Sequence, residues 1–292
     1  MKVLITGARG QLGFELQRTA PAGHELLAYD TDELDITRAS AVQQIISTRQ
    51  LDLIINAAAY TAVDKAEQEM DLAYAVNRDG ASNLAQAASD NHIRLIHVST
   101  DFIFDGNQAR PYLPQDKAHP LGVYGASKWS GEQRVRDICP DHAVILRTAW
   151  VYSKHGNNFV KTMLRLMAER TQLKVVADQV GTPTWAKGLA YAIWKIAENR
   201  DMKGVWHWTD AGVASWYDFA VAIQEEAVTL GLLEKQIEIL PIRSEEYPTP
   251  AKRPHYSVLE KSATWQCLGM APVHWRASLR QMLKELKDNR HA

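Results

Sequence analysis

Short apolar runs alternate with longer helical stretches through the first half of the chain. Each apolar run is typical of a β-strand, and the stretches between them favour helices. The run at 53–55 contains no polar residue, as expected of a strand covered on both faces. Strands separated by helices in this way predict a doubly wound parallel sheet of the Rossmann type, in the α/β class. The predicted strands are 3–5, 26–29, 53–55, 95–98 and 144–146, and the predicted helices are 10–19, 39–49, 66–90 (one helix or two) and 127–135.

The pattern changes after about Trp150, where prolines recur and the alternation of strands and helices breaks down. Amphipathic helices are predicted at 158–169 and 185–198, with others near 216–230 and 275–286. We therefore expect a dinucleotide-binding domain at 1–150. Residues 151–292 are expected to form mainly a smaller, irregular α+β substrate-binding domain, with some segments returning to the first domain and a cleft between the two.

Composition narrows the class of protein. The chain has 292 residues, enough for one large or two modest domains, and a formal net charge of −1. This balance argues against binding to nucleic acid or a membrane surface, because neutralising phosphates requires an excess of Lys and Arg. The only cysteines are Cys139 and Cys267, so reduced thiols are expected rather than a disulfide framework. With no long apolar run and a glycine as early as Gly7, neither a membrane helix nor a signal peptide is predicted, and the expected location is the cytoplasm.

A glycine-rich turn follows the first predicted strand and opens the first predicted helix. Gly7, Gly10 and Gly13 have the spacing Gly-x-x-Gly-x-x-Gly. Glycine permits a tight turn and lets backbone amides approach a pyrophosphate at a helix N-terminus, so this turn predicts a dinucleotide site. The alternative is an ordinary glycine-rich connection between a strand and a helix.

Two residues near this turn give opposite signals about the cofactor. Asp30 closes the second predicted strand, where a carboxylate accepts hydrogen bonds from the adenosine ribose and favours NAD over NADP. Arg9 lies beside Gly10, where a guanidinium would pair with a 2′-phosphate. Unless Arg9 is only a solvated surface side chain, we expect both NADH and NADPH to be used.

Tyr124 and Lys128 are four residues apart and therefore share one face of a helix. A free Tyr has a pKa of about 10, and an ammonium about 4 Å away supplies energy of the order needed to lower that pKa toward neutrality. Such a Tyr is a useful acid near neutral pH. Thr100 and Asp101 follow a predicted strand at the end where parallel sheets place ligands, which favours a catalytic role for Tyr124 and Lys128.

The same spacing occurs once more, at Tyr191 and Lys195. This pair lies in an apolar helical stretch and has no polar cluster upstream of it. We therefore expect Tyr191 to be a packing residue.

Longer segments carry a more specific signal. Residues 56–67 read Asn-Ala-Ala-Ala-Tyr-Thr-Ala-Val-Asp-Lys-Ala-Glu, and Ser-Thr-Asp follows at 99–101. With the glycine turn, these segments resemble the extended short-chain dehydrogenase/reductase family, and most closely its branch of dTDP-4-dehydrorhamnose reductases. The resemblance extends through most of the chain, at 123–125, 147–152, 156–159, 178–184 and 247–254.

The resemblance implies NAD(P)H-dependent reduction of the 4-keto group of dTDP-4-dehydro-L-rhamnose to dTDP-L-rhamnose. It gives Tyr124 the role of proton donor, Thr100 that of hydrogen-bond partner of the carbonyl oxygen, and Lys128 that of holding the nicotinamide ribose. The implied substrate contacts are Thr100, Asp101, Trp150 and Arg253. Together with the glycine turn, the expected cofactor contacts are Gly7, Gly10, Gln11, Leu12, Gly13, Asp30, Asp35, Ile36, Ala59, Tyr60, Thr61, Val98, Tyr124 and Lys128.

Structural alternatives exist for several of these residues. Trp150 is alternatively a core aromatic residue. Asn77 either touches the cofactor or caps a helix. Arg253 either binds a diphosphate or belongs, with Lys252, to a solvated basic surface. His97 lies in a predicted strand and is interpreted as a packed residue rather than a proton carrier.

The chain departs from the family pattern at two places. Some members form dimers through magnesium held by carboxylates, one of which matches Glu15, but the corresponding second position here is Lys187. This cation argues against a metal-linked homodimer, and the sequence has no metal-ligand spacing, so no metal is predicted and a homodimer stays possible. Where the family often has Arg-Pro-x-Asn-Ser, residues 253–257 read Arg-Pro-His-Tyr-Ser, so one polar substrate contact is absent or replaced by the Tyr hydroxyl.

Two other functions stay open at this point. An epimerase or 4,6-dehydratase of the same fold would share Tyr124 and Lys128. Dehydratases carry Asp-Glu after the Thr, whereas Phe102 follows Asp101 here, and an epimerase retains NAD that a reductase exchanges in each turnover. A non-catalytic subunit resembling the regulatory subunit of methionine adenosyltransferase is disfavoured because Thr100, Tyr124 and Lys128 are all present.

Overall fold

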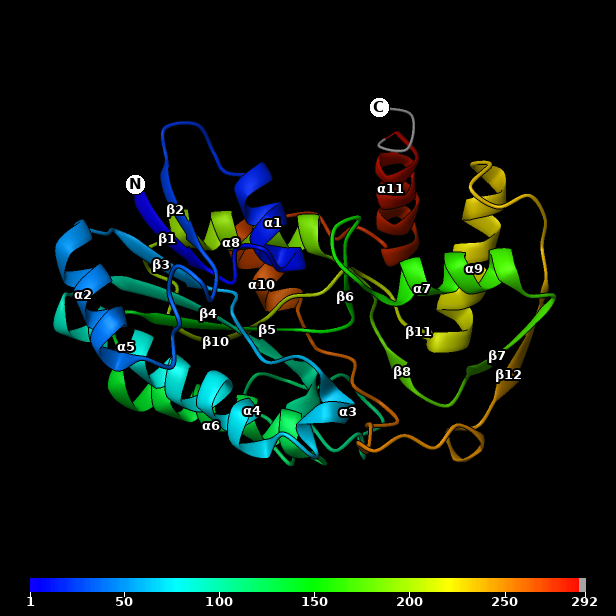
Figure 1. Cartoon of the computed structure of the whole chain (residues 1–292), viewed down its shortest axis with the longest axis horizontal. Coiled ribbons are helices and arrows are strands. Elements are labelled where there is room, and N and C mark those ends of the chain that lie inside the picture. The colour runs from blue at the N-terminus through cyan, green and yellow to red at the C-terminus, as the bar shows by residue number, and fades with distance from the viewer. Residues whose placement is uncertain (289–292) are drawn as a thin grey trace.

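A six-stranded sheet forms the core of the unit on the left of Figure 1 in the computed structural model, which describes residues 1–288. Its strand order is β10-β5-β4-β3-β1-β2, and every neighbouring pair is parallel. This arrangement confirms the predicted doubly wound α/β class. The strands are β1 (Lys2–Thr6), β2 (Glu25–Tyr29), β3 (Leu53–Asn56), β4 (Arg94–Thr100), β5 (Ala143–Thr148) and β10 (Gly204–His207).

Helices cover both faces of this sheet, which is why its central strands are apolar on both sides. One face packs against α1 (Gln11–Arg18) and α8 (Ala186–Glu198). The other face packs against α2 (Ala39–Arg49), α5 (Ala81–Asp90) and α6 (Val123–Ile138). Among residues 1–288, none of the helices has the length and hydrophobicity needed to span a bilayer.

The stretch predicted as one or two helices over 66–90 is more broken than expected. It consists of α3 (Val63–Ala66), α4 (Met70–Tyr74), a π-helix at Ala75–Gly80 and then α5. The π-helix carries the buried Asn77, whose side-chain amide bonds outside the helix, to the backbone of Tyr60. Apolar spacing does not encode such a local widening, which often occurs at functional sites.

A second group of elements packs around an aromatic and aliphatic core of its own (Figure 1, right). Its helices are α7 (Phe159–Glu169), α9 (Trp216–Thr229) and α11 (Trp275–Asp288), close to the predicted ranges. Its two-stranded pairs are β7 (Gln172–Val176) with β12 (Glu238–Ile242), β8 (Val180–Gly181) with β11 (Ala214–Ser215), and β6 (Val151–Tyr152) with β9 (Thr184–Trp185). Two 3₁₀ turns, at Asp101–Ile103 and Ser244–Glu246, and the short α10 (Ser262–Leu268) complete the described elements.

Two segments from the second half of the chain lie on the first unit. Strand β10 pairs with β5 as the edge strand of the main sheet, and α8 packs across α1. Neither β10 nor α10 was predicted, because each is only partly buried and lacks a continuous apolar pattern. On this packing we propose that the dinucleotide-binding unit comprises residues 1–150 together with α8 and β10.

Candidate active site

A cavity of about 1040 Å³ runs along the carboxyl ends of the main strands and reaches the second unit. Ligands bind at this edge in parallel α/β sheets. The cavity brings together all of the predicted site residues except Gly13. These lining residues are Gly7, Gly10, Gln11, Leu12, Asp30, Asp35, Ile36, Ala59, Tyr60, Thr61, Val98, Thr100, Asp101, Tyr124, Lys128, Trp150 and Arg253.

The glycine turn forms a backbone cradle at one end of this cavity. Gly7 has a φ of +71°, and a Cβ added there would lie 2.7 Å from the backbone of Ala58. No side chain caps the start of α1 at Gly10. A turn that excludes side chains and leads into an uncapped helix N-terminus fits the pyrophosphate of a dinucleotide.

Gly13 has a different role from the predicted one. A Cβ at this position would lie 2.2 Å from the carbonyl oxygen of Gly7 and 2.7 Å from Cα of Ala8. Gly13 therefore allows α1 to pack closely on the turn, and it does not line the cavity.

Asp30 and Arg9 meet at the end of β2, but not as a free pair. The Asp30 carboxylate accepts the backbone N–H of Arg9 at 2.9 Å and that of Thr31 at 2.8 Å. Partial burial opposes ionisation of Asp30, yet these hydrogen bonds outweigh it and lower the pKa of the carboxyl. The Arg9 guanidinium pairs with Asp32 and Glu33, both at 2.7 Å, while 58% of its side chain stays exposed, so it is a surface side chain engaged by two carboxylates.

Helix α6 places Tyr124 and Lys128 one turn apart at the cavity. The Lys128 ammonium donates to the backbone oxygen of Val98 at 2.7 Å. Burial lowers the pKa of Lys128 to about 8. Burial also raises the pKa of Tyr124 to about 12, with a hydrogen bond to Thr100 acting against this shift and the charge of Asp101 adding to it.

The predicted effect of Lys128 on the pKa of Tyr124 is therefore wrong. We expected the ammonium to draw the pKa of Tyr124 toward neutrality, whereas burial dominates and moves that pKa upward. Tyr124 therefore keeps its proton throughout the neutral range and can donate it, but as a weaker acid than a phenol tuned toward neutrality.

The pKa of Lys128 leads to a prediction about pH. If its ammonium holds the cofactor ribose, NADH affinity falls as the pH rises through about 8, because the folded-state pKa lies there rather than near its ordinary 10.5. Tyr124, with a pKa of about 12, does not titrate in that window. Fluorescence titration of NADH between about pH 6.5 and 9.5 measures the effect, and Lys128→Met should bind more weakly and without this slope. A wild-type affinity that is flat across the same range would rule out the ammonium as the ribose contact.

Thr100 and Asp101 lie where β4 ends. The Thr100 hydroxyl donates to Oδ1 of Asp101 at 3.2 Å and accepts the backbone N–H of Phe102. Burial raises the pKa of Asp101 to about 6, although hydrogen bonds from Ser257 and Thr100 oppose the shift. These polar groups face the same cavity as Tyr124.

Trp150 forms the wall of the cavity on the side of the second unit. Its ring stacks on that of Trp216, with centroids 3.5 Å apart and planes within 4°. A Cβ on Gly181 would lie 2.6 Å from the Trp150 ring, so glycine is needed behind it. The backbone of Trp150 has a φ of +47°, a conformation rare for bulky residues and commonest where function requires it. Trp150 is thus half-buried at the site rather than a core residue.

Arg253 reaches the cavity from the C-terminal part of the chain. Its guanidinium makes a two-pronged pair with Asp64, with N–O distances of 3.0 and 2.8 Å. It also donates to the hydroxyl of Thr249 and the backbone oxygen of Ala251. Arg253 is therefore oriented by specific partners, whereas Lys252 is exposed.

Asn77 supports the site in a way that neither predicted alternative described. It lies inside the π-helix, so it does not cap a helix, and it is not among the residues that line the cavity. Its side chain accepts the N–H of Tyr60 at 2.9 Å and donates to the oxygen of Tyr60 and to Ser127 Oγ. Ser127 in turn donates to the backbone oxygen of Tyr124. Asn77 thus ties the turn after β3 to the helix that carries Tyr124.

Two other interpretations are tested by burial. Tyr191 was expected to be a packing residue, but its side chain is 46% exposed on α8, so this expectation is wrong. Tyr191 is also not among the residues that line the cavity. His97 is fully packed, with Nδ1 2.9 Å from the Asn56 amide, and burial holds its pKa well below the ordinary value. His97 is thus a packed residue, as interpreted.

Glu15 and Lys187 belong to an ion-pair network away from the cavity. Glu15 is buried and accepts hydrogen bonds from Ser153 and Arg18, at 2.7 and 3.0 Å. Lys187 pairs with Glu285 at 2.5 Å. Within residues 1–288, no group of three or more His, Cys, Asp or Glu side chains is arranged to hold a metal ion.

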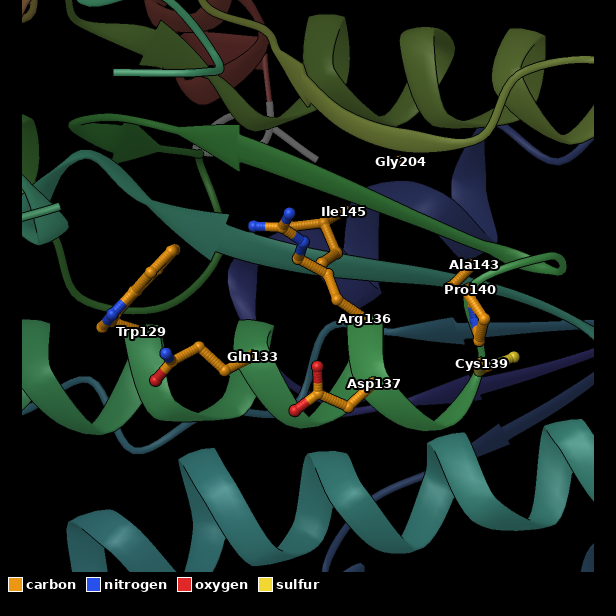
Figure 2. Close-up of a pocket in the computed structure, with 9 residues that line it drawn as sticks. All are labelled: Trp129, Gln133, Arg136, Asp137, Cys139, Pro140, Ala143, Ile145 and Gly204. Carbon is orange, nitrogen blue, oxygen red and sulfur yellow. The ribbon is translucent and has the colours of Figure 1, made fainter. Parts of the chain in front are cut away.

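A smaller cavity of about 460 Å³ lies along the C-terminal half of α6, beside β5 and the start of β10 (Figure 2). Figure 2 shows Gln133 and Asp137 on the helix and Cys139 and Pro140 just beyond its end. None of the predicted site residues lines this cavity.

Comparison with known proteins identifies the family of this chain. Residues 1–288 match the family model described as RmlD substrate binding domain. A dTDP-4-dehydrorhamnose reductase of Aggregatibacter actinomycetemcomitans is 44% identical, over 96% of this chain and 98% of its own. The enzyme of that name from Escherichia coli (strain K12) is 40% identical over 98% of both.

Solved structures give the same result. A dTDP-4-dehydrorhamnose reductase of Clostridium acetobutylicum superposes with a TM-score of 0.92 at 40% identity, covering 98% of this chain and 100% of its own. The Bacillus anthracis protein of that name, in complex with NADP, has a TM-score of 0.91 at 38% identity, covering 97% and 99%. The chain therefore belongs to the RmlD family, the family of the dTDP-4-dehydrorhamnose reductases.

Proposed function

We propose that this protein reduces the 4-keto group of dTDP-4-dehydro-L-rhamnose to the hydroxyl of dTDP-L-rhamnose, using NADH or NADPH. The observation that carries the proposal is the meeting of Tyr124, Lys128 and Thr100 in one cavity with the glycine cradle. Family membership supports the same activity, since relatives about 40% identical are named as this enzyme. In this role the protein is an NAD(P)-dependent oxidoreductase of dTDP-rhamnose and polysaccharide synthesis.

The residues of the cradle fit a dinucleotide. Gly7 and Gly10 leave room for the pyrophosphate at the uncapped start of α1, Asp30 offers a carboxylate to the adenosine ribose, and Lys128 offers an ammonium to the nicotinamide ribose. The Bacillus anthracis relative, solved in complex with NADP, supports a dinucleotide as the ligand. The chemistry that bound NAD(P)H supplies is a hydride for sugar C4.

The chain's own side chains handle the carbonyl oxygen and its proton. Thr100, whose hydroxyl donates to Asp101 in the ligand-binding cavity, redirects that hydrogen bond to the carbonyl oxygen and stabilises the negative charge that develops on it. Tyr124, protonated at neutral pH, then transfers its phenolic proton to the same oxygen. The ketone gains one hydride at carbon and one proton at oxygen, and the Tyr124 phenolate left behind recovers a proton from solvent.

Substrate contacts beyond the carbonyl come from three sides of the cavity. Trp150 offers an aromatic face to the sugar, and Asp101 offers a carboxylate to its hydroxyls. Arg253, held in place by Asp64, offers a guanidinium to the diphosphate, which guanidinium groups bind well. The substrate is thus a nucleotide sugar, and the preference for dTDP is part of this proposal.

A direct assay tests the function and separates it from its rivals. The decrease in NADH or NADPH absorbance is followed with dTDP-4-dehydro-L-rhamnose as substrate. We expect one cofactor oxidised per sugar, and faster turnover with dTDP than with UDP or GDP sugars. Product formation without net cofactor oxidation would indicate an epimerase, and no product with intact NADH binding would favour a regulatory subunit.

Cofactor choice gives a second prediction. Asp30→Ala removes the carboxylate that serves the adenosine ribose and that would repel a 2′-phosphate. We expect NADH affinity to fall about tenfold and NADPH affinity to change much less. Titration of both cofactors against wild type measures this, and equal losses would show that Asp30 does not discriminate between them.

Two further expectations, a homodimer and a cytoplasmic location, stay predictions. Sedimentation of the purified protein would measure the first, and fractionation of cells the second.

A further inference from the structure

Thr148 carries a hydroxyl whose partner is missing from the protein itself. Its side chain lines the main cavity, and the residue is only 6% exposed. Its Oγ1 is buried and makes no hydrogen bond to any of residues 1–288. A buried hydroxyl without a hydrogen-bond partner lowers the stability of the fold, so such a group often serves to bind a ligand.

The position of Thr148 in the sheet shows what faces it. It is the last residue of β5 and pairs in register with Thr100 of β4, so the two side chains project to the same face. Leu146, two residues earlier on that face, packs with Leu12 of α1 and Leu189 of α8. Thr148 therefore lies on the face of the sheet that carries the glycine turn and its helix.

The lining residues follow the sheet from one side to the other. Asp30 lies at the end of β2, the glycine turn at the end of β1, Ala59 after β3, Thr100 at the end of β4 and Thr148 at the end of β5. A dinucleotide with its adenosine ribose at Asp30 and its pyrophosphate at α1 extends along this row. Its nicotinamide end then reaches the carboxyl ends of β4 and β5.

We propose that the Thr148 hydroxyl binds the carboxamide of the nicotinamide ring and so fixes which face of the ring is turned toward the sugar. The inference rests on the proposed dinucleotide site. A hydroxyl can donate to the carboxamide oxygen or accept from its amide N–H, so it suits a group that offers both. Binding gives Oγ1 the partner that the protein lacks.

The test compares Thr148→Val, which keeps the branched shape and removes the hydroxyl, with Thr148→Ser, which keeps the hydroxyl. We expect Thr148→Val to raise the Kd for NADH about tenfold and Thr148→Ser to leave it within about threefold. The Kd for ADP-ribose, which lacks the nicotinamide ring, should be unchanged in both. The ligand-free Thr148→Val protein should melt at or above the wild-type temperature, because an unpartnered hydroxyl has been removed.

An unchanged NADH affinity in Thr148→Val would overturn the proposal. If the KM for the nucleotide sugar rose at the same time, the hydroxyl would bind the sugar and not the nicotinamide, and the proposal would still be overturned. Loss of ADP-ribose binding together with NADH binding would show general damage to the cavity and would also count against it. These titrations contain no sugar. They therefore give their answer even if the protein reduces a different keto sugar from the one proposed.

Discussion

Tyr124→Phe is expected to lower kcat about 10²- to 10⁴-fold while leaving the Kd for NADH within about twofold of wild type. Only the phenolic O–H is lost, so the ring still packs edge-on against Phe102. Without that proton donor, the oxyanion formed at sugar C4 is stabilised only by Thr100 and must take its proton from water. Steady-state rates with dTDP-4-dehydro-L-rhamnose and a separate NADH titration measure the two effects.

The chain contains its own control for this variant. Tyr191 is also followed four residues later by a lysine, Lys195, but Tyr191 is exposed on α8 and away from the cavity. Tyr191→Phe should therefore leave kcat and KM unchanged. A Tyr124→Phe enzyme that turns over at near the wild-type rate would remove Tyr124 from the mechanism.

Arg147→Ala is expected to destabilise the fold by about 3–5 kcal/mol. Arg147 on β5 and Glu132 on α6 form an ion pair at 2.7 Å in which the side chains are 1% and 0% exposed. Arg147 also donates to the oxygen of Pro114, and its guanidinium lies over the rings of Phe104 and Trp129. Removing it leaves the Glu132 carboxylate buried without its main partner, and α6 is the helix that carries Tyr124 and Lys128.

Urea denaturation, monitored by circular dichroism, measures the decrease in the free energy of unfolding. The matched control is Arg165→Ala, because Arg165 and Glu169 pair on the surface of α7 with side chains 61% and 54% exposed. This second variant should change the free energy of unfolding by less than about 0.5 kcal/mol. A loss of under about 1 kcal/mol for Arg147→Ala would show that the buried pair does not hold β5 and α6 together.

Local patterns were sufficient to predict much of the fold. The strand at Leu53–Ile55 was predicted from its apolar run, and helix α2 has the predicted bounds because its spacing is regular. Strand β10 was not predicted, since it is only partly buried and its place at the edge of the sheet depends on β5, far away in the sequence. Spacing along the chain does not encode such pairings.

The site shows the same division. The glycine turn and the Tyr124–Lys128 pair are local signals that could be interpreted directly. The Asp64–Arg253 pair joins residues 189 positions apart, and the stack of Trp150 on Trp216 joins the two units, so neither was predictable from spacing. The direction of the Tyr124 pKa shift was predicted wrongly, because burial of the phenol outweighs the charge of the neighbouring lysine and is not visible in the spacing of the two residues.

Reduction of a keto sugar at C4 by hydride transfer is the activity that the site is proposed to perform. The most direct measurement uses NADH carrying deuterium at the transferable position of the nicotinamide ring, with dTDP-4-dehydro-L-rhamnose as acceptor and mass spectrometry and NMR of the product. We predict dTDP-L-rhamnose with one deuterium, at C4 of the sugar, and one oxidised cofactor per product. A product without deuterium, or no product from a protein that binds NADH, would contradict the claim.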